Sequence, residues 1–182
     1  MVDKSKLDKL SRAAFLQGTW RKGKTLIRPP WAQGESDFTS KCDSSCQACV
    51  DACPEKIIVI GRGKYPQIDF SKGECTFCER CVDACNYDAL VKQPESEPWT
   101  YKAVIDMEQC ITQQSVVCRS CSEMCEVAAI KFHPVVGGVS SPELKSDLCT
   151  GCGACISVCP SNAVFIQPFD DIDQGEIGVD SL

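Results

Sequence analysis

The cysteines of this chain constrain its fold more than any other feature. Sixteen of its 182 residues are cysteine, and they fall into four groups of four. Every group ends in the pattern C-x-x-C-x-x-x-C, and the first and last groups continue directly into proline. The groups are Cys42, Cys46, Cys49 and Cys53; Cys75, Cys78, Cys81 and Cys85; Cys110, Cys118, Cys121 and Cys125; and Cys149, Cys152, Cys155 and Cys159. Thiols at such regular spacing predict either a disulfide framework or a metal centre.

The spacing favours [4Fe–4S] clusters. In bacterial ferredoxins, three thiolates of one such loop bind one cube, and the fourth thiolate, which we expect on the helix that follows, binds the neighbouring cube. This rule predicts four ligand sets, each named here by its first cysteine: the Cys42 set (Cys42, Cys46, Cys49, Cys85), the Cys53 set (Cys53, Cys75, Cys78, Cys81), the Cys110 set (Cys110, Cys118, Cys121, Cys159) and the Cys125 set (Cys125, Cys149, Cys152, Cys155). We expect an electron carrier with four clusters and no catalytic residues.

Disulfides and zinc are the alternatives. Disulfide-rich chains are secreted, but the sequence contains no apolar run typical of a signal peptide or a membrane span. We therefore expect a cytoplasmic chain with reduced thiols and no transmembrane segment. Structural zinc sites usually combine two separated cysteine pairs, whereas three cysteines lie within seven or eight residues in three of these groups. His133 is the single histidine, which leaves no mixed Cys/His zinc site.

The repeated pattern of a cysteine group followed by extended segments predicts the fold class. Each cysteine group precedes a short apolar strand signal, at residues 57–60, 89–91, 129–132 and 163–166, and then a turn and a second extended piece. Successive groups are separated by similar intervals, with 22, 25 and 24 residues from the last cysteine of one to the first of the next. One unit therefore recurs four times. We predict an α+β protein with tandem bacterial 2[4Fe–4S] ferredoxin-like modules.

The predicted modules are too small for a conventional core. Domains of about 60 to 70 residues usually need disulfides or metals for stability, so we expect the clusters to dominate the cores and the apoprotein to be largely unfolded. The polar stretch at residues 93–98 predicts the boundary. The predicted regions are a basic arm with a short helix and a Pro-Pro segment (1–37), a first module (38–96), a second module (97–168) and an acidic, disordered tail (169–182).

The third group departs from the pattern, because seven residues separate Cys110 from Cys118. It is either an expanded loop over a filled site or an empty repeat, which would leave three clusters. An empty site would leave Cys159 unused although it stands in a regular Cys-Pro context. We therefore expect the site to be filled.

Charge is distributed unevenly along the chain. The net charge is −6, but residues 1–34 carry +6 and the remainder carries −12. An acidic, cluster-loaded body argues against nucleic acid as a partner and leaves redox partner proteins as the expected class. The apolar side of the predicted arm helix either packs on the body or contacts a partner.

Beyond its cysteines, the chain resembles the NapF family of ferredoxin-type accessory proteins of bacterial periplasmic nitrate reductase systems. The segments that carry the resemblance are SRAAFLQG (11–18), WRK (20–22), IRPPW (27–31), SVVCRSC (115–121) and LCTGCGAC (148–155). The resemblance implies a cytoplasmic iron–sulfur protein that acts in maturation of the catalytic subunit NapA before its export, with contact through the basic arm. Ala13 follows Arg12, so the arm lacks the paired arginine of an export signal, which favours the cytoplasm.

Two other functions remain compatible with the sequence. The chain could serve as an electron-transfer subunit of a membrane-associated or soluble oxidoreductase complex. Alternatively, it could be a donor or scaffold that passes on whole clusters rather than electrons.

Overall fold

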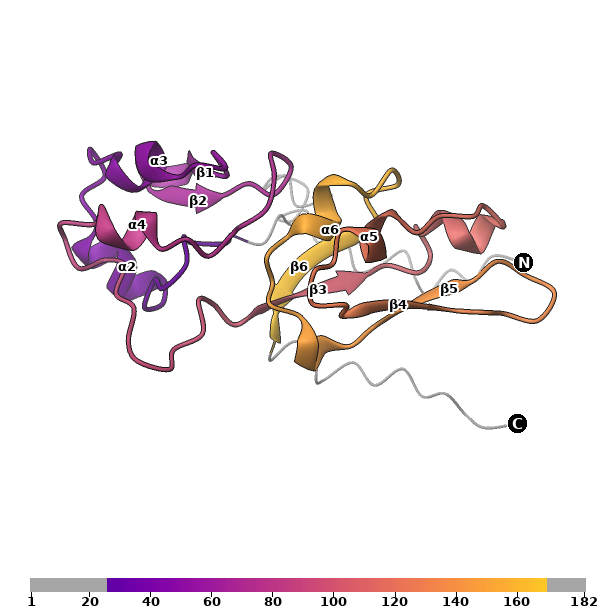
Figure 1. Cartoon of the computed structure of the whole chain (residues 1–182). Helices are drawn as coiled ribbons and strands as arrows, with labels where there is room; N and C mark the ends of the chain where they lie inside the picture. The colour runs from indigo at the N-terminus through magenta and orange to yellow at the C-terminus, as the bar shows by residue number, and fades with distance from the viewer. Residues whose placement is uncertain (1–25, 170–182) are drawn as a thin grey trace, which may run out of the picture.

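The computed structural model describes residues 26–169. The predicted arm helix, the acidic tail and the segments 11–18 and 20–22 lie outside the described residues. Within the described range, the elements form two groups that lie side by side (Figure 1). We call them the N-terminal half (residues 26–91) and the C-terminal half (residues 99–169). No helix in this range is long and apolar enough to cross a membrane.

The N-terminal half combines short helices with a hairpin. Its elements are α2 (Glu35–Lys41), α3 (Ala48–Ala52), β1 (Ile58–Ile60), the 3-10 turn η2 (Arg62–Lys64), β2 (Pro66–Ile68) and α4 (Arg80–Asp83). In α2, acidic residues in the first turn and Lys41 in the last turn complement the helix dipole, and Phe38 is buried. β1 and β2 are antiparallel, with Ile58 opposite Ile68. Both of these isoleucines are buried in the core.

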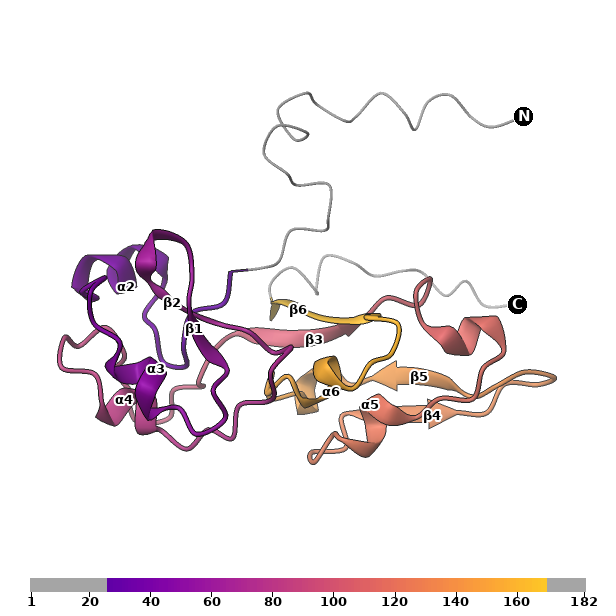
Figure 2. The same cartoon turned by 90° about the horizontal axis from the view of Figure 1, so that it is seen from above.

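The C-terminal half has two pairs of strands. Its elements are β3 (Tyr101–Ile105), η3 (Ile111–Gln114), α5 (Ser120–Glu123), β4 (Ile130–His133), β5 (Ser141–Leu144), η4 (Ser146–Leu148), α6 (Ala154–Ser157) and β6 (Val164–Pro168). β4 and β5 form a hairpin, whereas β3 pairs antiparallel with β6 from the far end of the half (Figure 2). Ala103, opposite Ile166, is buried with it, so this sheet turns one face to the core.

The short helices separate the third cysteine of each group from the fourth. The third lies within α3, α4, α5 or α6, and the fourth lies one or two residues beyond the helix end. The expectation that the fourth cysteine lies on the helix is therefore wrong. Each helix has only four or five residues, so it ends before that position. α3 packs against α4, and α5 packs against α6.

The predicted strand signals after the cysteine groups are confirmed at three of the four places, by β1, β4 and β6. The signal at residues 89–91 gives only an isolated bridge between Ala32 and Leu90. The segment that faces it contains Pro29 and Pro30, which have no N–H to donate. A longer ladder cannot form there.

Candidate metal centre

The four predicted ligand sets each line a separate cavity. The cavity volumes are about 350 Å³ for the Cys53 set, 330 Å³ for the Cys110 set, 330 Å³ for the Cys42 set and 320 Å³ for the Cys125 set. In every case the lining includes three cysteines of one loop and one from the neighbouring group, as cross-ligation requires. The helices produce this arrangement, because the third and fourth cysteines of a group reach different cavities.

The thiols around each cavity favour a group that binds several separate sulfurs. In every cavity, four thiols from two different loops lie around one space. Zinc bound by four thiolates at ~2.3 Å would need sulfurs packed around one point. Among residues 26–169, no three His, Cys, Asp or Glu side chains are placed to hold one metal ion. The donor set of four soft thiolates suits an iron–sulfur cluster.

Burial makes the free thiols poor acids. It raises the pKa of Cys49 and Cys75 to about 12 and that of Cys81 and Cys121 to about 11, and in most of them the neighbouring thiolates raise it further. The pKa of Cys155, the most enclosed of these thiols, is raised as well. Four thiolates around one cavity therefore need a cationic group between them, which the iron of a cluster would supply.

Backbone N–H groups are already directed at sulfur in the C-terminal half. Ala129 and Ala163 donate to Cys125 Sγ and Cys159 Sγ, each at 3.2 Å. Although burial raises the pKa of Cys159, hydrogen bonds from Ser161 and from nearby backbone N–H groups outweigh it, so the pKa is lowered. Such bonds prepare the sulfur to be an anionic ligand.

The insertion in the third group folds so that Cys110 still reaches its cavity. η3 takes up most of the inserted residues, and Ser115 ends it in a left-handed conformation with φ of 61°. Thr112 is buried there, with its Oγ1 3.2 Å from Cys110 Sγ. The extra residues therefore do not displace the ligand from the Cys110 set.

Sequence reasoning missed that the cavities differ in the polar residues around them. The residues around the cavity of the Cys53 set include three glutamates, Glu55, Glu74 and Glu79. Within the described part of the chain, the residues around the cavity of the Cys110 set include no acidic residue but three that carry hydroxyls, Thr112, Ser120 and Ser161. A signal for this difference stands in the sequence, because the residue after each Cys-Pro is Glu55 in the first group and Ser161 in the last.

The two halves meet at two of the predicted cluster-binding loops. The N–H of Cys75 donates to the carbonyl of Cys152 at 2.8 Å. Cys75 belongs to the Cys53 set and Cys152 to the Cys125 set, so these two cavities are the inner pair. The cavities of the Cys42 and Cys110 sets are the outer pair.

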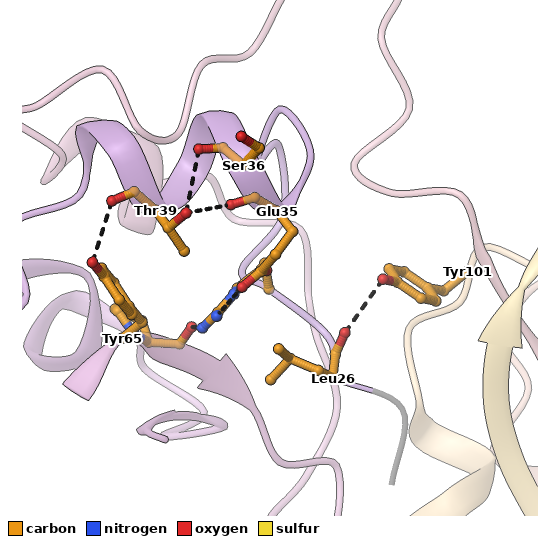
Figure 3. Close-up of polar contacts among 8 residues, drawn as sticks. Leu26, Glu35, Ser36, Thr39, Tyr65 and Tyr101 are labelled. Carbon is orange, nitrogen blue, oxygen red and sulfur yellow. Dashed lines mark hydrogen bonds and ion pairs between the residues drawn. The ribbon is translucent and has the colours of Figure 1, made fainter. Parts of the chain in front are cut away.

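Aromatic side chains fill this junction. Trp99 makes edge contacts with Phe70 and Phe77, with ring centroids 5.8 Å apart in both pairs. Its Nε1 donates to the carbonyl of Thr150 at 3.2 Å. Farther along, the Tyr101 hydroxyl donates to the Leu26 carbonyl at 3.3 Å (Figure 3). Residues from both halves therefore exclude water between the inner cavities.

Two glycines make the close packing possible. Gly151 and Gly153 have φ of 74° and 84°. A Cβ at Gly151 would overlap the Tyr101 carbonyl oxygen, and one at Gly153 would overlap the Phe70 ring. Both glycines also line the cavity of the Cys125 set, so the loop that carries them packs tightly on one side and borders a predicted cluster site on the other.

Comparison with known proteins places the chain in a family. The model of the 4Fe–4S dicluster domain matches residues 41–89 and 116–163. The ferredoxin-type protein NapF of Escherichia coli K12 is 42% identical over 154 residues, which cover 85% of this chain and 92% of the relative. The chain belongs to the NapF family of ferredoxin-type proteins. As a member, it is an iron–sulfur protein that binds [4Fe–4S] clusters.

Further relatives support the same conclusion. NapF of Haemophilus influenzae is 36% identical over 168 residues, covering 92% of each chain. The ferredoxin-type protein NapG of E. coli K12 is 29% identical over 183 residues, covering 89% of this chain and 78% of NapG. The second matched range begins at residue 116, so Cys110 falls outside it. The structure, however, brings Cys110 to the same cavity as Cys118 and Cys121.

Proposed function

We propose that this chain is a non-enzymatic electron-transfer protein with four [4Fe–4S] clusters, one in each of the four cysteine sets. The observation that carries the proposal is that all four cysteines of each set line one common cavity. Bound clusters take up and release single electrons, so no side chain has to act as an acid or base. The chain's part is to anchor the clusters, direct N–H groups at sulfur and exclude water.

The junction gives electrons a route between the halves. The Cys75–Cys152 hydrogen bond joins the backbones of two ligand loops directly. The predicted order of sites along the molecule is therefore Cys42 set, Cys53 set, Cys125 set and Cys110 set, with the outer two at opposite ends. This order allows one half to receive an electron and the other to deliver it.

Anaerobic analysis tests the number of clusters. We expect about sixteen irons and sixteen sulfides per chain, because each cube holds four of both. EPR of the reduced protein should show interacting paramagnetic clusters. A colourless, iron-poor protein that nevertheless folds compactly would overturn the proposal.

We further propose that the chain acts in the cytoplasm in maturation of the nitrate reductase catalytic subunit NapA before export. Support comes from relatives named NapF and NapG, and from the contrast between an acidic body and a basic N-terminal segment. Residues 2–25 carry seven of the eight basic residues of that segment, whereas residues 27–31 are mostly buried in the body.

A pull-down experiment tests this role. Deleting residues 2–25 should abolish capture of precursor NapA while leaving the iron content unchanged, and the intact chain should capture it. Failure of the intact chain to capture the precursor would contradict the NapA role. Iron that leaves the chain as NapA becomes loaded would instead indicate a cluster donor, and a stoichiometric complex that persists through purification would indicate a permanent redox subunit.

A further inference from the structure

The indole nitrogen of Trp31 has no hydrogen-bond partner in the part of the chain that the structure describes. Trp31 is only 4% exposed, and its Nε1 is the one buried side-chain nitrogen or oxygen within residues 26–169 that makes no hydrogen bond. Leaving a buried donor unpaired costs about 1–3 kcal/mol. Folded proteins rarely tolerate such a group, so a partner outside the protein atoms is expected.

The position of Trp31 points to that partner. Trp31 lines the cavity of the Cys53 set, together with Phe77 and Ile57. Trp99, by contrast, lines none of the four cavities described above, and its Nε1 already donates to the Thr150 carbonyl. The residue that carries the unpaired donor therefore lies at a predicted cluster site.

The backbone holds Trp31 in a conformation that a bulky residue normally avoids. Its φ is 63°, in the left-handed region. The Trp31 N–H donates to the Pro98 carbonyl at 2.6 Å, and its carbonyl accepts from the Val91 N–H at 3.1 Å. Strain of this kind persists where surrounding contacts enforce it, and it concentrates at functional sites.

The electrostatics of the cavity favour a donor at this place. Three glutamates are among the residues at the same cavity, and Lys92 pairs with one of them, Glu79. The remaining negative charge opposes the addition of an electron to a cluster there. An N–H dipole directed at sulfur acts in the opposite sense, because it stabilises the added negative charge.

We propose that the Trp31 indole N–H donates a hydrogen bond to a sulfur of the cluster held by the Cys53 set and raises the reduction potential of that cluster. The inference rests on the proposed function, since it requires a cluster in this cavity. Trp31 is then a tuning residue rather than only a part of the core.

Three variants test this in anaerobic, EPR-monitored redox titrations of the loaded full chain. Cys78→Ala should remove one redox component and a quarter of the iron, which identifies the cluster of the Cys53 set. Trp31→Phe keeps an aromatic ring but removes the N–H, and it should shift that same component to more negative potential. Trp99→Phe removes the other described indole N–H and should leave the component in place.

Labelling gives a second measurement that does not depend on a stable Trp31 variant. With indole-¹⁵N tryptophan in the Trp99→Phe background, ENDOR of the reduced protein should detect ¹⁵N coupled to one cluster, and Trp31→Phe should abolish that coupling. Absence of both the coupling and the potential shift would overturn the inference and would place the partner elsewhere in the chain. An unchanged iron content in Cys78→Ala would instead overturn the cluster assignment itself.

Discussion

The two halves arrange their cysteines in the same way but differ in the strand pairing around them. In the C-terminal half, β3 and β6 pair along five residues each. In the N-terminal half, the corresponding segments make only the bridge between Ala32 and Leu90, because Pro29 and Pro30 interrupt the donor pattern. The cavities nevertheless have nearly equal volumes. The cysteine loops thus define the cavities, and the strand pairing around them can differ between the halves.

In the N-terminal half, where this ladder is missing, the Arg28 side chain holds the N-terminal segment through other contacts. Arg28 Nη1 donates to the Pro66 carbonyl at 2.9 Å, and Arg28 Nε donates to Glu35 at 2.7 Å. The hydrogen bond from Arg28 also lowers the pKa of Glu35. The guanidinium lies over the rings of Phe38 and Tyr65, at 5.1 and 5.6 Å from their centroids. Arg28 therefore ties the N-terminal segment to α2 and β2. The Tyr65 hydroxyl adds a further link to α2, because it donates to the Thr39 carbonyl at 3.3 Å (Figure 3).

Loss of one thiolate has the largest expected effect and tests whether the halves are equally loaded. Cys121→Ser in the Cys110 set and Cys49→Ser in the Cys42 set should each remove about four irons, because a cube needs its ligands. Anaerobic iron and sulfide analysis measures the loss. If Cys49→Ser loses a cluster and Cys121→Ser loses none, the halves differ and the third group is empty.

Adding one methyl group at Gly153 should break the junction between the halves. Gly153→Ala forces a Cβ against the Phe70 ring at a positive φ, so we expect a destabilisation of about 3 kcal/mol. Anaerobic denaturant titration, followed by the cluster absorbance, measures it. The control is Gly138→Ala, whose Cβ meets only Val135 at 3.6 Å. Equal denaturation midpoints for the two variants would contradict the tight junction.

Removing the Arg28 contacts should weaken the N-terminal half. Arg28→Met keeps apolar bulk but leaves the Pro66 carbonyl without its donor, and we expect a loss of about 2 kcal/mol. Lys41→Met removes an exposed ion pair with Asp37 and should cost less than about 0.5 kcal/mol. The same titration compares the two. If Arg28→Met proved as stable as Lys41→Met, the Arg28 contacts would not stabilise the N-terminal half.

The residue after Cys-Pro should tune the clusters of the two halves in opposite directions. Glu55→Ser removes a carboxylate and should raise the potential of the Cys53-set cluster. Ser161→Ala removes a hydroxyl 3.7 Å from Cys159 Sγ and should lower the potential of the Cys110-set cluster. One hydrogen bond of about 1 kcal/mol corresponds to about 40 mV for one electron. Redox titration that gave shifts of the same sign would contradict this contrast.

Much of the site was predictable because cluster binding depends on the spacing of cysteines within a few residues. Four cysteines at fixed intervals predict which thiolates share a cavity, and the structure places each predicted set around one cavity. The strand after the second group was not predictable from its apolar signal alone. Its partner segment lies about 60 residues earlier in the chain, and the prolines there decide the outcome.

The roles of Trp31 and Trp99 could not be predicted for a similar reason. Both are single aromatic residues beside proline, so their sequence context is nearly the same. The long-range hydrogen bonds of the folded chain direct Trp31 to a cavity and Trp99 to the junction.

The sequence by itself determined the chemistry of this protein, because thiolate spacing over a few residues dictates what a loop can bind. Only the tertiary structure decided the order of the sites, the contact of Cys75 with Cys152 and the placement of an unpaired indole N–H beside one cavity. These features depend on packing between segments far apart in the chain, which spacing within one cysteine group does not encode.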